Sequence, residues 1–176
     1  MHGSSGLGMI ETAIAAQEFG RFLVPTPHFE SAFFSARLIA AAGSDQQRAS
    51  WLPGIADGSL VVVPAWYEAG GGDDLATINL ALASKCDGFS LTGRKLFVAH
   101  ATVADLACAP ARDPDGAGAH VLASVDARAP GIRITAEPNL ASAPLSIGQA
   151  PFVDMPVPPV SGKAMAAGGE RSEAFR

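Results

Sequence analysis

The chain has 176 residues and a net charge of −5, and it is 48% hydrophobic but only 16% charged. This length fits one domain with accompanying helical segments, and the hydrophobic share is enough for a packed core. An acidic chain without a basic stripe argues against nucleic-acid binding. The sequence contains no apolar run of about 18 residues that would span a membrane. Its two cysteines, Cys86 and Cys108, favour a reduced, cytoplasmic protein over a disulfide scaffold.

The first part of the chain has the periodicity of helices. Apolar side chains recur at helical spacing over residues 9–19 and again over residues 29–39, and a glycine follows each run. We therefore expect two or three helices in residues 1–58, which would form a partial N-terminal helical domain.

The third helix has recognisable start and stop signals. Ser44, with Gln47 three residues later, predicts a capping box in which each side chain bonds the backbone N–H of the other residue. Pro53 is expected to kink or shorten this helix because proline has no N–H to donate. Gly58 is expected to end it.

From residue 59 onward the pattern changes to short apolar runs separated by turn signals. Strands linked in this way, without intervening helices, indicate an antiparallel barrel or sandwich. We predict a middle β-domain over residues 59–158, then a linker and the start of a truncated helix over residues 159–176. The predicted fold class is α+β, a short helical segment followed by an antiparallel β-barrel or sandwich domain. The predicted strands are residues 60–65, 77–83, 89–98, 104–109, 120–125, 132–135 and 151–157.

Three segments carry a resemblance to a known family. The first is Glu-Phe-Gly-Arg ending at Arg21, and the second combines Gly-Ser-x-x-Gln, ending at Gln47, with Trp-Leu-Pro ending at Pro53. The third is Asp-Gly-Phe-x-Leu-x-Gly-x-Lys-x-Phe-Val, which runs from Asp87 to Val98. Together they make most of the chain similar to acyl-CoA dehydrogenases.

The resemblance implies an oxidoreductase of lipid metabolism. Members of the family are FAD flavoproteins that oxidise acyl-CoA thioesters at the α,β bond, with hydride transfer to FAD, and pass the electrons to an electron-transfer flavoprotein. The family's Thr-Glu-Pro-x-x-Gly-Ser-Asp and Lys-x-Trp-Ile-Thr-Asn segments align with residues 67–74 and 95–100. The resemblance therefore implies that the flavin is lined by Tyr67, Glu68, Phe97 and Ala99, and that Asp73 and Asp74 lie near the thioester.

The same resemblance places the catalytic base outside this chain. The family's base is a carboxylate in a C-terminal helical bundle, so no catalytic residue is assigned here and we expect a truncated or incomplete form of the enzyme. The alternative is a non-catalytic structural subunit, or a β-domain that binds a partner in a homo- or hetero-oligomer. The presence or absence of bound flavin would distinguish the two.

The sequence allows two interpretations for several side chains. Phe97 fits either a flavin platform or an ordinary aromatic of a β-core. Arg94 and Lys95 fit either a phosphate site or the solvated face of a strand. The four histidines share no metal-ligand spacing with the cysteines, so we predict no metal site.

Overall fold

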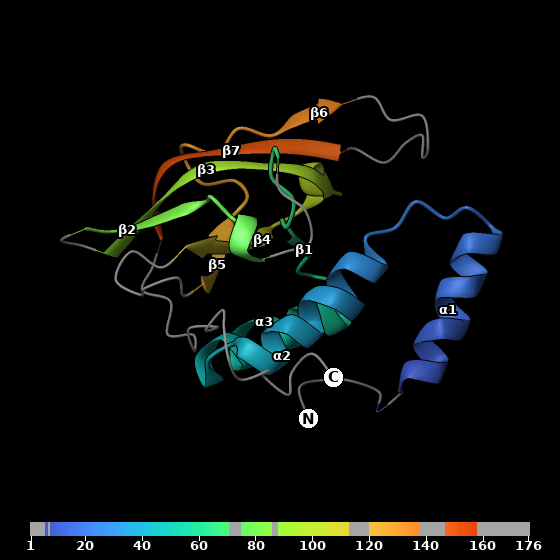
Figure 1. Cartoon of the computed structure of the whole chain (residues 1–176). Coiled ribbons are helices and arrows are strands. Elements are labelled where there is room, and N and C mark those ends of the chain that lie inside the picture. The colour runs from blue at the N-terminus through green and yellow to red at the C-terminus, as the bar shows by residue number, and fades with distance from the viewer. Residues whose placement is uncertain are drawn as a thin grey trace.

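The computed structural model describes residues 6, 8–70, 75–85, 88–112, 120–137 and 147–157. Helices come first and strands follow (Figure 1). The helical elements are α1 (Met9–Arg21), the π-helix η1 (Phe29–Ser35), α2 (Ala36–Ala42) and α3 (Asp45–Asp57), with short 3₁₀ turns η2 (Leu75–Thr77) and η3 (Ala101–Val103). The strands are β1 (Val62–Pro64), β2 (Ala81–Lys85), β3 (Gly88–Ala99), β4 (Leu106–Arg112), β5 (His120–Asp126), β6 (Thr135–Glu137) and β7 (Ile147–Val157).

The boundaries of α3 follow its capping residues. The Ser44 side chain accepts a hydrogen bond from the Gln47 N–H, so the helix begins where the capping box predicts. Pro53 does not shorten the helix, which continues to Asp57. Gly58 then takes a left-handed φ of +80°, which a glycine adopts without steric cost, and the helix ends there as expected.

The expected second helix contains an irregularity that its periodicity does not reveal. Its first half, η1, is a π-helix, and α2 follows directly from it. The Ser31 hydroxyl inside η1 accepts a hydrogen bond from the Val62 N–H at 3.1 Å. The helix is therefore bonded to the first strand by a buried side chain.

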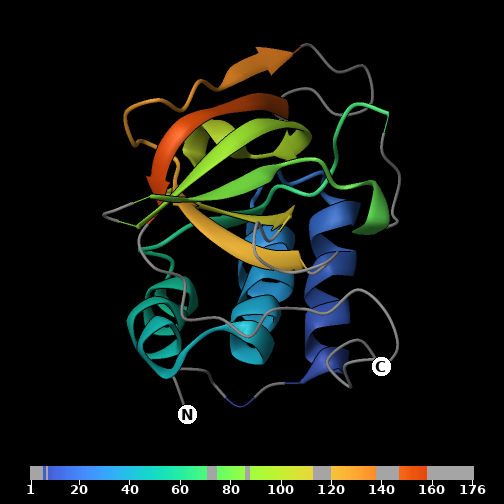
Figure 2. The ribbon, with the colours of Figure 1, turned by 60° about the vertical axis from the view of Figure 1, so that its left-hand side comes forward.

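Within the described residues, seven strands form one curled sheet with the order β1-β4-β2-β3-β7-β6, and β5 pairs with β4 at the side. Most neighbouring strands are antiparallel, but β4 is parallel to both β1 and β2. The α+β class is thus confirmed, whereas the sheet is mixed rather than wholly antiparallel. The prediction missed this because β1 joins the sheet beside β4, which comes much later in the chain. The helices α2 and α3 lie on one side of the sheet (Figure 2).

Strand β4 separates two apolar cores. Its side chains alternate, as the pleat of a strand requires. Leu106 and Cys108 pack with α2, α3 and β1, whereas Ala107, Ala109 and Ala111 face the core inside the curl of the sheet. Sheet and helices are therefore joined through one face of β4, and the opposite face fills the sheet interior.

The second predicted strand begins later than the sequence indicated. Residues 77–83 were expected to be extended throughout, but a 3₁₀ turn ends at Thr77 and β2 starts at Ala81. The intervening N–H groups of Asn79 and Leu80 donate to the Glu68 carboxylate, at 2.7 and 3.0 Å, instead of to a neighbouring strand. A side chain distant in sequence thus shortens the strand.

The remaining boundaries shift by a few residues, and β7 is longer than expected, at Ile147–Val157. Strands β2 and β3 are antiparallel, with Lys85 opposite Gly88. The linker and truncated helix predicted over residues 159–176 lie outside the described residues. Within the described part of the chain, no helix is long and apolar enough to cross a membrane.

Candidate functional site

The candidate site begins where the chain leaves β1. Tyr67 forms an isolated antiparallel bridge with Leu96 of β3, and the Leu96 N–H donates to the Tyr67 carbonyl oxygen at 2.7 Å. The Tyr67 side chain is 45% exposed. An aromatic ring is therefore presented to solvent beside the third strand.

Phe97 lies next to this bridge, at an irregular point of β3. Lys95 pairs with Ala150 of β7 and Val98 pairs with Gly148, so β3 has one residue more than its partner between these pairs. This is a β-bulge, a feature that redirects side chains and is frequent near active sites. Phe97 adopts a φ of +53° and its ring is 63% exposed. A left-handed conformation is costly for a bulky residue, and such strain concentrates at functional sites.

An ion pair joins the two segments that carry these aromatic residues. The Nζ of Lys95 is 2.6 Å from Oε1 of Glu68, and the two side chains are 0% and 7% exposed. Lys95 also donates to the carbonyl oxygens of Pro110 and Trp66, at 2.9 and 3.4 Å. A charge buried so completely is tolerated only when it is paired and hydrogen-bonded, as here.

The surroundings of Lys95 show that both interpretations drawn from the sequence, a phosphate site and the solvated face of a strand, are wrong for this residue. The ammonium neither reaches solvent on an exposed strand face nor is free to bind a phosphate, because Glu68 and two carbonyl groups occupy it. Burial lowers the pKa of Lys95, and the hydrogen bond and charge of Glu68 oppose that shift. Sequence reasoning missed this partnership because 27 residues separate the two side chains. Arg94, by contrast, is exposed.

The proposed flavin-lining residues thus come from two adjacent segments. Tyr67 and Glu68 lie on the segment after β1, and Phe97 and Ala99 lie at the end of β3, where Ala99 is half-buried. The carboxylate oxygens of Glu68 are both occupied by partners within the protein. Asp73 and Asp74, the proposed thioester-side residues, lie outside the described residues.

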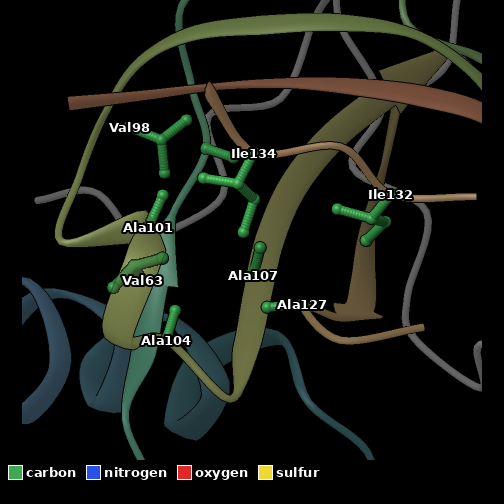
Figure 3. Close-up of a pocket in the computed structure, with 9 residues that line it drawn as sticks. Val63, Val98, Ala101, Ala104, Ala107, Ala127, Ile132 and Ile134 are labelled. Atoms are coloured by element: carbon green, nitrogen blue, oxygen red, sulfur yellow. The ribbon is translucent and has the colours of Figure 1, made fainter. Parts of the chain in front are cut away.

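A small pocket inside the curl of the sheet has a different character (Figure 3). Every side chain that lines it is apolar, so it offers no side-chain hydrogen bond to a polar cofactor. In the part of the chain described, no group of three or more His, Cys, Asp or Glu side chains is arranged to hold a metal ion. The pocket is lined by Val63, Ala65, Val98, Ala101, Ala104, Ala107, Ala127, Ile132 and Ile134.

In this fold helices precede a curled sheet, and comparison with known proteins agrees with it. The family model "Acyl-CoA dehydrogenase, N-terminal domain" matches residues 1–59. The acyl-CoA dehydrogenase FadE27 of Mycobacterium tuberculosis is 28% identical over 135 residues, which cover 76% of this chain and 34% of that protein. The chain is therefore similar to acyl-CoA dehydrogenases, through the family's N-terminal domain over residues 1–59 and through this relative, and it spans about a third of the relative's length.

Solved structures show the same fold. The ChsE4-ChsE5 complex from Mycobacterium tuberculosis matches with a TM-score of 0.76 and 24% identity, covering 91% of this chain and 42% of the matched chain. A glutaryl-CoA dehydrogenase from Mycobacterium smegmatis, solved in complex with FADH2, matches with a TM-score of 0.68 and 21% identity. That match covers 76% of this chain and 34% of the other. These likenesses extend over the helices and the sheet together.

Proposed function

We propose that this chain provides the flavin-facing part of an acyl-CoA dehydrogenase, an FAD enzyme that oxidises acyl-CoA thioesters at the α,β bond. The observation that carries the proposal is Phe97, an exposed aromatic residue held at a positive φ in the segment where the family resemblance implies flavin contact. An exposed and strained phenylalanine contributes little to the fold itself, so a ligand-binding role accounts for it better than a core role.

The residues present suit an aromatic cofactor. The exposed rings of Phe97 and Tyr67 offer flat apolar surfaces, and aromatic rings favour offset stacking on one another. Ala99 provides no side-chain hydrogen bond, so polar contacts with the flavin in this region depend on the backbone. Glu68 would influence the flavin only through the residues next to it, because its carboxylate oxygens already accept hydrogen bonds from within the protein.

In the proposed reaction, FAD supplies the acceptor for the hydride that leaves the substrate β-carbon. The role of this chain is to bind and orient the flavin and to exclude water from its face. Asp73 and Asp74 remain proposed for the thioester side. We assign the α-proton abstraction to a carboxylate outside the described residues, the onward electron transfer to an electron-transfer flavoprotein, and the location to the cytoplasm.

The test is a titration of the purified chain with FAD, followed by visible absorbance and by quenching of flavin fluorescence. We expect saturable binding that Phe97→Ala weakens by about fivefold, because loss of a stacked ring costs roughly 1 kcal/mol. Phe22→Ala is the matched control, since Phe22 is 69% exposed and stands at the end of α1 rather than on β3. Equal effects of the two substitutions, or a chain that takes up no FAD, would refute the proposal.

A second function, that of a partner-binding subunit, is favoured by the exposed apolar side chains of the N-terminal segment. Helix α1 has no buried residue, and Ile10 and Ile14 are 75% and 58% exposed. Phe22 and Leu23, directly after it, are exposed as well. Large exposed apolar patches mark interaction sites. A colourless chain that stays colourless in excess FAD, yet sediments as an oligomer, would favour this second function.

A further inference from the structure

We propose that the buried Lys95–Glu68 ion pair is a positioning pair, which fixes the exposed rings of Tyr67 and Phe97 relative to each other. The inference deepens the proposed function and rests on it in one respect, namely that these two rings face the flavin. Neither charged side chain would touch the cofactor itself. Their effect would pass through the backbone of the two segments that carry the rings.

Lys95 joins three segments of the sheet. From β3 its ammonium group reaches Glu68 and the Trp66 carbonyl oxygen on the segment after β1, and the Pro110 carbonyl oxygen on β4. An ammonium has three donors, and each has an acceptor here. Because the side chain is completely buried, water cannot replace any of these acceptors.

Glu68 extends the junction to a fourth segment. Its carboxylate accepts from the N–H groups of Asn79 and Leu80, which immediately precede β2. One oxygen, Oε1, receives both the Lys95 ammonium and the Leu80 N–H. Hydrogen bonds that involve charged groups are stronger than neutral ones. The same pair therefore links the segment after β1, the segment before β2, β3 and β4.

The rings are attached directly to this junction. Tyr67 immediately precedes Glu68, Phe97 follows Lys95 by two residues, and the Leu96 N–H between them donates to Tyr67. The positive φ of Phe97 persists only if the surrounding structure enforces it. We attribute the constraint on the φ of Phe97 to the ion pair and to the Tyr67–Leu96 bridge.

A purely stabilising ion pair would behave differently from a positioning pair. Buried ion pairs can often be replaced by apolar residues of similar volume without loss of stability. An apolar pair, however, would leave the N–H groups of Asn79 and Leu80 without their carboxylate and would not hold the Trp66–Glu68 segment in register. A positioning role therefore predicts a local effect at the rings beyond any loss of overall stability, and the double variant E68M/K95M tests for it by local hydrogen exchange.

The experiment measures three quantities on the whole chain, namely the denaturant unfolding midpoint, the hydrogen-exchange rate of the Leu96 amide and the affinity for FAD. For E68M/K95M we expect a lower unfolding midpoint, because the Leu80 N–H and the Pro110 carbonyl oxygen lose their partners. We also expect Leu96 exchange to accelerate by about tenfold more than that of the amides paired between β4 and β5, and FAD binding to weaken by about tenfold, since a loosened supporting shell displaces a site. Arg128→Met is the control, because it breaks the exposed Arg128–Asp105 pair at 2.8 Å, and it should leave all three quantities unchanged.

Glu68→Gln is the second variant, chosen because it keeps the shape of the side chain and one acceptor oxygen should the double variant fail to fold. It should accelerate Leu96 exchange as well. The inference is overturned if, in a folded E68M/K95M or Glu68→Gln chain, Leu96 exchange accelerates no more than that of the amides paired between β4 and β5. If the wild-type chain binds no FAD, the proposed function fails, whereas the exchange rates still decide whether the pair positions the two segments.

Discussion

Ser44 and Gln47 exchange two hydrogen bonds at the start of α3. The Ser44 Oγ accepts from the Gln47 N–H at 3.1 Å, and the Gln47 Oε1 accepts from the Ser44 N–H at 2.9 Å. Two backbone donors that the helix itself leaves unpaired are satisfied in this way. Because α3 packs on the sheet through Ile55, the start of this helix contributes to the stability of the whole fold.

Replacing Ser44 with alanine should lower the free energy of unfolding by about 0.5–2 kcal/mol, since an N-cap hydroxyl contributes that amount. Denaturant unfolding measures this. The control is Ser50→Ala, because Ser50 is exposed within the same helix, and alanine is the better helix former. A Ser44→Ala chain as stable as Ser50→Ala would show that the capping box contributes nothing.

Gly93 lies too close to Leu80 to tolerate a side chain. A Cβ at Gly93 would stand 2.8 Å from the Leu80 Cδ1 and 3.1 Å from the Leu80 Cα, and the φ of Gly93 is +155°. Gly93→Ala should therefore destabilise the chain by about 1–3 kcal/mol, the usual effect of overpacking. Gly20→Ala is the comparison, because nothing lies within 4 Å of its added Cβ. Thermal unfolding of the two variants should differ clearly, and equal midpoints would contradict the predicted close contact.

Phe97 should be needed for flavin binding but not for folding. Phe97→Gly removes the strain of a left-handed phenylalanine, roughly 1–2 kcal/mol, and loses little burial because the ring is exposed. We therefore expect unfolding stability to stay level or rise by up to about 1 kcal/mol. The neighbouring Val98→Gly should instead destabilise the chain by about 2 kcal/mol or more, since Val98 is 2% exposed. A Phe97→Gly chain as unstable as Val98→Gly would assign Phe97 to the core.

The Cys108 thiol should resist alkylation at neutral pH. Burial raises the pKa of Cys108 from 9.0 to about 12, so almost no thiolate forms in the folded protein. In a Cys86→Ser background, iodoacetamide should label Cys108 only after denaturant is added, because the thiolate is the nucleophile. Rapid labelling of the folded chain at neutral pH would contradict this.

The same shift predicts a pH dependence of stability. The folded-state pKa of Cys108 is the higher one, so between pH 9.0 and about 12 the folded state binds more protons than the unfolded state. Stability should therefore be lost as the pH rises through this window, by at most about 1.4 kcal/mol per pH unit. Cys108→Ala should unfold with a shallower alkaline slope than the wild type, and identical slopes would show that the thiol does not contribute.

Local patterns in the sequence determined the elements that depend on neighbouring residues. The capping box at Ser44, the stop at Gly58 and the change from helices to strands near that glycine were all predictable, because their hydrogen bonds and φ preferences involve residues a few positions apart. The family resemblance likewise drew attention to Phe97 and Tyr67, because it depends on short contiguous segments.

Only the tertiary structure decided the features that join distant residues. The parallel pairing of β1 with β4, the shortening of β2 by the Glu68 carboxylate and the burial of Lys95 all involve partners far apart in the chain. A lysine on a strand is expected to reach water, because burying an unpaired charge is costly. The charge of Lys95 is tolerated inside the sheet because folding brings Glu68 and two carbonyl groups to it. The spacing of residues along the sequence does not reveal these contacts.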